Sequence, residues 1–190
     1  ASADIIISLG RGIGDEPDME VFESLAEAMG GVLACSRPIV DKNLLPKYHQ
    51  VGTSGVEVKP KVYLALGISG AFQHLGGIKG SPLIVAVNKD PRAPIFRVAQ
   101  YGIVGDLNEV VPALEEKIKE VSALQGKLEE EALRFSLDFQ EHLKPEQRAA
   151  FITFVERRLP NVQGGKGRRS PRWKRGMGAG APQAAEPCGP

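Results

Sequence analysis

The strongest constraint on the fold is a set of short apolar runs that recur along the first part of the chain. They cover residues 4–9, 32–35, 62–66, 83–87 and 102–104. Each run is too short for a helix, and glycine or polar residues follow it, which is typical of buried strands. Strands that are apolar throughout indicate a parallel sheet covered on both faces by helices. The sequence therefore predicts an α/β fold, with a parallel sheet flanked by helices.

Helical periodicity fills two of the segments between and after these runs. Apolar positions from residue 18 to 29 fall on one helical face, and Gly30 and Gly31 supply a left-handed stop. Residues 107–121 form a second amphipathic segment, which we expect to close the sheet domain.

Composition divides the chain into three expected parts. The first domain covers residues 1–122, a helical extension covers 123–160, and a basic tail covers 161–190. Two strongly charged helices are expected in the extension, at 128–143 and 145–159. The tail consists of Gly, Pro, Arg and Ala without periodicity, which predicts disorder.

The overall composition is that of a globular protein. Hydrophobic residues make up 42% of the 190 residues and charged residues 25%. Cys35 and Cys188 are too few for a disulfide framework, which favours a reducing compartment. No apolar stretch is long enough to span a membrane, and no signal peptide is visible. The chain lacks an initiator Met and enters a strand almost at once, so we expect a missing upstream segment.

Ligands of parallel sheets bind outside the carboxyl ends of the strands. The segments at those ends are 10–12, 36–37, 67–74 and 88–90, and they are rich in glycine, polar residues and cations. After the run 62–66, a turn presents Ser69 and Gly70, and a helix is expected to begin near Ala71. The N-terminus of such a helix suits a pyrophosphate, and Gln73 and His74 would lie in its first turn.

Known nucleotide motifs narrow the class of ligand. No G-x-G-x-x-G pattern with a following ribose-binding acid is present, which disfavours a nicotinamide site. Residues 10–17, GRGIGDEP, lack the Lys and Ser/Thr of a P-loop. No pair of nucleophile and base is evident, and no metal site is expected.

Four segments resemble one known family. They are ISGAFQHLGGIKGSPLIVAVNKDPRAPIFRVAQYGIVGDL at 68–107, QVGTSG at 50–55, SRPIVD at 36–41 and SLGRG at 8–12. Together they resemble the alpha subunit of electron transfer flavoproteins, over roughly residues 4–121. The resemblance implies a Rossmann-like domain that binds one FAD.

Carried over position by position, the resemblance implies a set of FAD contacts. They are Arg11, Ser36, Arg37, Val51, Gly52, Thr53, Ser54, Ser69, Gly70, Ala71, Phe72, Gln73, His74, Asn88, Asp106 and Leu107. Arg37 would lie near the isoalloxazine, and His74 near flavin O2. Both are candidates for stabilising the negative charge that reduction places on that ring.

The same resemblance places the Ser54 hydroxyl near flavin N5. Ser54 stands where the family usually has Thr, and Thr53 where it usually has Gln, so the loop departs from the common GQTG form. Residues 69–74 would wrap the ribityl chain and pyrophosphate. The last three contacts, Asn88, Asp106 and Leu107, would hold the phosphate-ribose and adenine end.

The resemblance also implies partners. The chain would pair with a beta subunit, accept electrons from dehydrogenases such as acyl-CoA dehydrogenases, and pass them to a quinone oxidoreductase, as in fatty acid beta-oxidation. The expected location is the cytoplasm of a bacterium or the mitochondrial matrix of a eukaryote.

Other interpretations stay open at this point. The chain could be a nicotinamide-dependent enzyme of a related α/β fold. The tail sequence GKGRRSPRWKR has the charge and the one aromatic residue that nucleic-acid contact uses, although such runs are usually solvated.

Several residues also have a purely structural interpretation. Arg37 could pair with Asp41, and the segment 89–90 could be a plain turn before Pro91. Tyr63 and Tyr101 are expected to be half-buried strand aromatics, and Cys35 a small core residue, all without chemistry.

Overall fold

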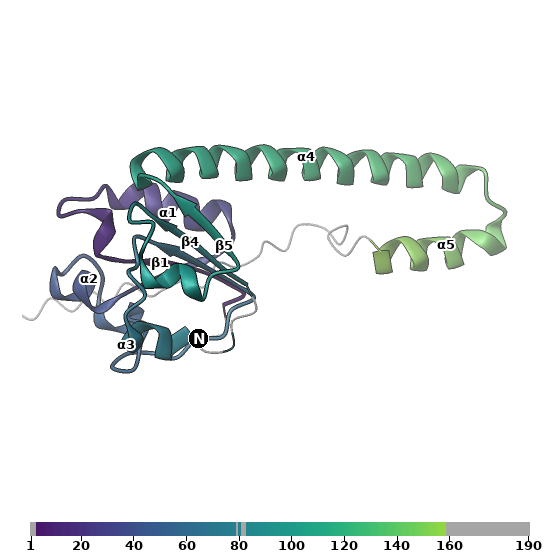
Figure 1. Ribbon diagram of the computed structural model, residues 1–190. Helices are drawn as coiled ribbons and strands as arrows, with labels where there is room; N and C mark the ends of the chain where they lie inside the picture. Colours follow the sequence, from purple (N-terminus) through teal and green to yellow (C-terminus); the bar gives the residue numbers. More distant parts are fainter. Residues whose placement is uncertain (1–2, 79, 81–82, 159–190) are drawn as a thin grey trace, which may run out of the picture. The chain divides into compact units, whose positions relative to one another are not determined.

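The computed structural model describes residues 3–78, 80 and 83–158 (Figure 1). The chain divides into two compact units, Ala1–Leu128 and Glu129–Pro190. The predicted disordered tail at 161–190 lies outside the described residues.

The first unit is built on a five-stranded sheet in which every neighbouring pair is parallel. Its strands are β1 (Ile5–Leu9), β2 (Val32–Cys35), β3 (Val62–Leu66), β4 (Leu83–Asn88) and β5 (Tyr101–Val104). The order across the sheet is β2-β1-β3-β4-β5, one of the common orders of Rossmann-like folds. The predicted α/β class is confirmed, and the strand bounds differ from the apolar runs by at most one residue at either end.

Helices α1 (Met19–Ala28) and α4 (Leu107–Glu141) cover one face of the sheet. Leu25 of α1 and Val111 of α4 belong to the same buried cluster as Ile7 and Leu9 of β1. The expected crossover helix is confirmed: the Asp18 carboxylate caps α1 by accepting from the Glu20 N–H (3.1 Å).

The opposite face carries short helices and loops instead of long helices. Val51, Ile78 and Ile95 pack there against Ile6 and Tyr63 of the central strands. The short helices of the first unit are η1 (Arg11–Ile13), α2 (Arg37–Asp41), η2 (Lys47–His49), α3 (Phe72–Leu75), η3 (Gly76–Ile78) and η4 (Pro94–Arg97).

Strand β5 corrects the expectation that every strand is buried on both faces. All four of its residues are exposed, and β5 forms an edge of the sheet. Tyr101 is 66% exposed and Tyr63 on β3 is fully buried, so neither tyrosine is half-buried as expected. Cys35 is buried, and burial raises the pKa of its thiol to about 12, in keeping with the expected core residue.

Helix α4 corrects the expectation of separate helices at 107–121 and 128–143, because it runs unbroken from Leu107 to Glu141. A glycine inside a helix costs only about 1 kcal/mol, and Gly126 has open space around it, so nothing there stops the helix. The proposed domain boundary at 122 falls within this helix and stays a prediction.

The second unit contains the end of α4 and helix α5 (Pro145–Arg158), which begins at the expected proline. The rings of Phe139 and Phe151 lie 5.2 Å apart and join the two helices. The Arg148 guanidinium donates to the Leu143 carbonyl (3.1 Å) in the connection. Across the described ranges of both units, no helix is long and apolar enough to cross a membrane.

Candidate nucleotide site

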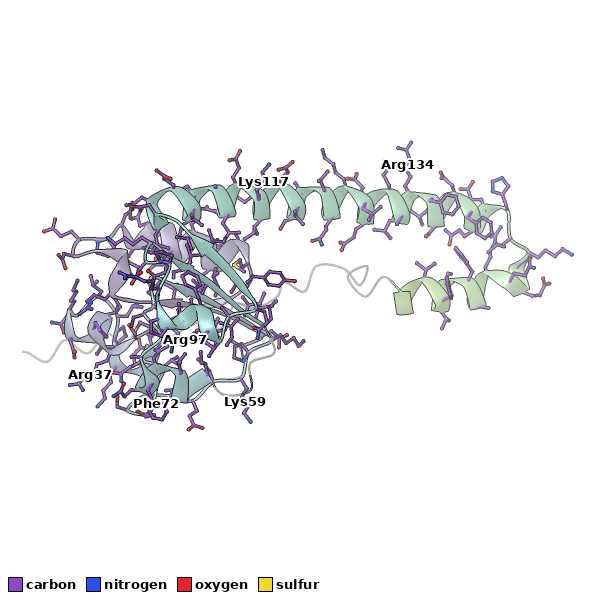
Figure 2. The ribbon with its side chains drawn as sticks, viewed as in Figure 1. Arg37, Lys59, Phe72, Arg97, Lys117 and Arg134 are labelled. Carbon is purple, nitrogen blue, oxygen red and sulfur yellow. The ribbon has the colours of Figure 1, made fainter. Side chains whose placement is uncertain are left out.

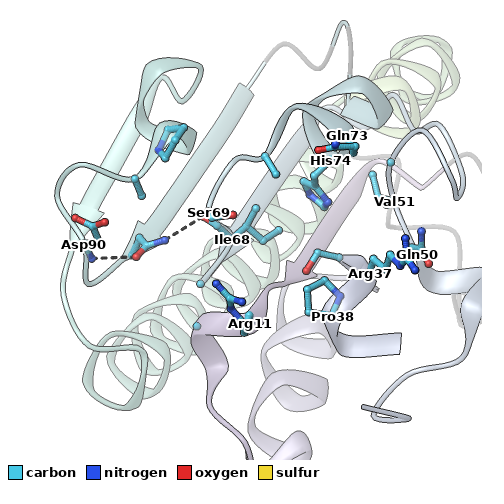
Figure 3. Close-up of a pocket in the computed structure, with 18 of the residues that line it drawn as sticks. Arg11, Arg37, Pro38, Gln50, Val51, Ile68, Ser69, Gln73, His74 and Asp90 are labelled. Carbon is cyan, nitrogen blue, oxygen red and sulfur yellow. Dashed lines mark hydrogen bonds between the residues drawn. The ribbon is translucent and has the colours of Figure 1, made fainter. Parts of the chain in front are cut away.

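A pocket of about 660 Å³ opens at the carboxyl ends of the strands (Figure 3). Its walls come from the segments after β1, β2, β3 and β4, and from the loop that contains Gln50 to Ser54. In the sheet, β2 lies on one side of β1, and β3 lies on the other side of β1. The pocket therefore lies at the point where the strand order reverses, which is where ligands of open α/β sheets bind.

Close contact between two glycine-containing loops forms the floor of the pocket. The Gly12 N–H donates to the Gly67 carbonyl (3.0 Å), and the Gly10 N–H donates to the Leu66 carbonyl (2.8 Å). A Cβ on Gly12 would lie 2.8 Å from the Gly67 Cα, so a side chain there would force the loops apart. This contact holds Arg11 beside the loop that follows β3.

The loop after β3 turns sharply at Gly70, whose φ is 85°. Helix α3 then has only four residues, Phe72–Leu75, and no side chain caps it. So short a helix aligns few peptide dipoles, and the expected pyrophosphate site at its N-terminus stays a prediction.

Three cations and one acid line the pocket: Arg11, Arg37, Lys89 and Asp90. An excess of positive charge in a concave site favours anionic ligands. The ion pair between Arg37 and Asp41, the structural alternative for this arginine, is present: Arg37 Nε lies 3.6 Å from Asp41 Oδ2. Both side chains are more than 60% exposed, and an exposed pair of this kind is weak, so Arg37 stays available to a ligand.

The segment that follows β4 reaches the pocket through two hydrogen bonds, drawn in Figure 3. Asn88 Nδ2 donates to the Ile68 carbonyl, and the Asp90 N–H donates to Asn88 Oδ1; each donor lies 3.0 Å from its acceptor. Asn88 thereby joins the β4 loop to the β3 loop. The turn at 89–90, for which a purely structural interpretation was also open, places Lys89 and Asp90 on the pocket wall.

A buried hydrogen bond lies behind the pocket wall. The Tyr63 hydroxyl lies 2.9 Å from Nε2 of His74, and His74 is only 6% exposed. Burial lowers the pKa of His74 to about 4, so the imidazole is neutral at pH 7. A neutral His74 can offer a hydrogen bond but no positive charge. Of the two residues expected to stabilise charge, Arg37 is therefore the cation.

The loop from Gln50 to Val56 forms another wall. The buried Gln50 side chain donates from Nε2 to the Ser54 hydroxyl (2.8 Å), and the Val56 N–H donates to the Gln50 carbonyl (2.8 Å). The Thr53 N–H donates to the Gln73 carbonyl (2.8 Å), which joins the loop to α3. The Ser54 hydroxyl is thus held at the pocket by a residue that sequence reasoning did not select.

Most of the residues expected to contact FAD line this one pocket. They are Arg11, Ser36, Arg37, Val51, Gly52, Ser54, Ser69, Ala71, Gln73, His74 and Asn88. Their roles toward a ligand stay predictions.

Five expected contacts do not line the pocket: Thr53, Gly70, Phe72, Asp106 and Leu107. Gly70 packs against the backbone of Ile95. Phe72 is 80% exposed and projects outward from the first unit (Figure 2). Leu107 is buried in the sheet core, and the Asp106 carboxylate accepts from the Asn108 N–H (2.8 Å) at the start of α4.

Other lining residues were not among the expected FAD contacts, among them Gly12, Pro38, Gln50, Ile68, Lys89 and Asp90. For Lys89 and Asp90 a signal existed, because both follow a predicted strand directly. Nothing in the local pattern marks Gln50, since its place depends on the fold of its loop against α3.

The strand order, the pocket at the switch point and its cationic lining define a nucleotide-binding α/β domain. Comparison with known proteins makes this class more specific. Residues 1–79 match the family model described as the electron transfer flavoprotein FAD-binding domain. This match and the relatives described next support the resemblance to electron transfer flavoprotein alpha subunits that the sequence indicated.

Three relatives show how far the similarity extends. The electron transfer flavoprotein subunit alpha of Thermoanaerobacterium thermosaccharolyticum is 53% identical over 119 residues, 63% of this chain and 36% of the relative. The mitochondrial subunit alpha of Arabidopsis thaliana is 50% identical over 119 residues, 63% and 33% of the two chains. The acryloyl-CoA reductase electron transfer subunit beta of Anaerotignum propionicum is 53% identical over 121 residues, 62% and 33%. The chain thus spans about a third of the length of these relatives.

Proposed function

We propose that this chain binds one FAD in the pocket and carries electrons between protein partners. The observation that carries the proposal is the pocket at the point where the strand order reverses. Its lining contains the cations Arg11, Arg37 and Lys89 together with the neutral, buried His74. A dinucleotide needs cations for its pyrophosphate and directional hydrogen bonds for its ring system. Both kinds of group are present in this lining, so its residues fit FAD.

Each group has a task in the proposed complex. Arg11 and Lys89 attract the pyrophosphate, and Asn88 lies toward the adenosine end. Arg37, Ser54 and His74 face the isoalloxazine, as the family resemblance implies. Bound FAD supplies an electron-accepting ring system, and the protein's part is to hold it and to tune its potential. The exposed guanidinium of Arg37 stabilises negative charge near the ring.

The carrier role rests on what the pocket contains. Serines line it, but the one histidine there is bonded to Tyr63 rather than to a serine. This arrangement lacks an activated nucleophile and suits storage of electrons better than covalent catalysis. The proposed electron donors and acceptors are therefore other proteins.

The proposed assembly contains a beta subunit, a donor dehydrogenase such as an acyl-CoA dehydrogenase, and a quinone oxidoreductase. The name of the Anaerotignum propionicum relative links a similar subunit to an acyl-CoA-transforming enzyme, which supports this choice. The relatives include a protein of a bacterium and a mitochondrial protein, and a bacterial cytoplasm or a mitochondrial matrix stays the proposed location.

An FAD titration of the full chain, with and without a coexpressed beta subunit, tests the function. We expect visible flavin absorbance that survives gel filtration, and reduction of that flavin by an acyl-CoA dehydrogenase supplied with its substrate. NAD and FMN titrations run in parallel as competing ligands. A colourless complex that ignores FAD and binds NAD would reject the carrier in favour of a nicotinamide enzyme.

A further inference from the structure

The hydrogen bond between Tyr63 and His74 determines which group His74 offers to the pocket. Tyr63 is fully buried on β3, His74 is 6% exposed on α3, and the bond joins the phenol oxygen to Nε2 over 2.9 Å. The other ring nitrogen, Nδ1, is buried and has no hydrogen-bond partner among the described residues. Because His74 lines the pocket, Nδ1 is the nitrogen left for a ligand.

Both side chains are uncharged at pH 7. Burial lowers the pKa of His74 to about 4 and raises the pKa of the Tyr63 phenol well above its usual range. A neutral imidazole carries one proton, so one nitrogen donates and the other accepts. The partner of one nitrogen therefore decides the role of the other.

Two considerations place the proton on Nδ1. A phenol is a strong O–H donor and a weak acceptor, whereas an unprotonated imidazole nitrogen is a strong acceptor, so the Tyr63 hydroxyl donates to Nε2. The cationic lining of the pocket also suits a ligand that brings acceptor atoms.

We propose that Tyr63 is a positioning residue that holds His74 as the Nδ1–H tautomer and so makes it a neutral hydrogen-bond donor to an acceptor oxygen of the bound ligand. The identity of that ligand rests on the proposed function; for FAD the acceptor is a ring carbonyl. A ligand that presented an N–H or O–H to Nδ1 would be rejected.

The tautomer can be measured in the FAD-free full chain by nitrogen NMR of 15N-labelled histidines. The chain has three histidines, and the His74 signals are those lost in His74→Asn. We expect a protonated Nδ1 and an unprotonated Nε2 in the unsubstituted protein. A protonated Nε2 would overturn the proposal, whatever the chain binds. The measurement needs neither a Tyr63 variant nor a cofactor.

The effect of Tyr63 is tested by Tyr63→Phe, with Tyr101→Phe on the exposed β5 strand as the matched control. Loss of the phenol hydroxyl frees Nε2, so we expect a mixture of tautomers. We also expect FAD to bind about three- to tenfold more weakly, the range that one hydrogen bond gives. The control should change neither quantity. An unchanged tautomer in a folded Tyr63→Phe protein contradicts the positioning role.

Combining the two substitutions separates positioning from mere packing. The amide nitrogen of an asparagine can stand where Nδ1 stands, so His74→Asn keeps a donor that needs no tautomer control. Adding Tyr63→Phe to His74→Asn should then cost no further FAD affinity. If Tyr63→Phe weakened FAD binding as much in the His74→Asn protein as in the chain that keeps His74, Tyr63 would act by packing alone. If the unsubstituted chain binds no FAD, the proposed function fails, while the NMR result still decides the tautomer.

Discussion

Gln50 donates a hydrogen bond to the Ser54 hydroxyl over 2.8 Å, and both residues line the pocket. Because the serine oxygen accepts from Gln50, its own proton is free to point at a ligand. A serine side chain rotates more freely than the β-branched threonine usual in the family, so Gln50 supplies an orientation that the side chain itself lacks.

Gln50→Leu and Ser54→Ala should therefore have similar and non-additive effects. Loss of one hydrogen bond should weaken FAD binding by about three- to tenfold. We expect the midpoint potential of bound FAD to change more than the affinity, because in the proposed complex the Ser54 hydroxyl faces the ring atom that gains charge and a proton. Isothermal titration and spectroelectrochemistry measure the two quantities. Ser136→Ala, which removes a hydroxyl bonded within α4, is the control. Fully additive effects of the pair would count against this coupling.

Arg37→Ala should lower both the FAD affinity and the midpoint potential of bound FAD, because a cation near the ring favours its reduced, negatively charged form. Loss of a charge-assisted contact predicts roughly ten- to a hundredfold weaker binding. Asp41→Ala is the matched control: it removes the exposed ion pair and keeps the guanidinium. Equal losses in the two variants would mean that the ion pair matters and the cation does not.

The buried His74 predicts a pH-dependent stability. Its pKa falls from 6.5 to about 4 on folding, so the unfolded chain binds the additional proton between these values. Its contribution is fully present above pH 6.5 and is lost as the pH falls toward 4, and it amounts to about 3 kcal/mol. Urea unfolding at a series of pH values measures it. The slope should flatten in His74→Gln and stay unchanged in His142→Gln, whose ring is exposed.

Two glycines should respond to alanine in opposite directions. Gly70 has a φ of 85° and packs against the Ile95 backbone, so Gly70→Ala should destabilise the protein by about 1 to 3 kcal/mol. Gly126 lies inside α4 with open space around it, so Gly126→Ala should stabilise by about 0.5 to 1 kcal/mol. Thermal unfolding followed by circular dichroism compares them. A tolerated alanine at position 70 would show that the turn after β3 can relax.

Much of this fold could be predicted because its signals are local. Runs such as Val62–Leu66 are apolar throughout and are followed by glycine, so they mark buried strands and their ends. The edge position of β5 and the full burial of Tyr63 could not be predicted, since both depend on which elements pack beside them. The length of α4 was missed because glycine alone is a weak helix terminator.

The candidate site was predictable where a residue lies at the carboxyl end of a strand: Asn88 is the last residue of β4, and Arg11 comes two residues after the end of β1. Gln50, by contrast, acts through a contact within its own folded loop. Asp106 also follows a strand, yet its carboxylate caps α4 and lies off the pocket. Proximity to a strand end therefore selects candidates, and only the tertiary arrangement says which of them share a cavity.

The touching loops at Gly12 and Gly67 mean that the cavity floor exists only once the first and third strands have paired. Cofactor loading and folding of the sheet centre are therefore one linked equilibrium. Any molecule held there acts as a clamp across the middle of the sheet, and raising its concentration raises the melting temperature of the whole unit.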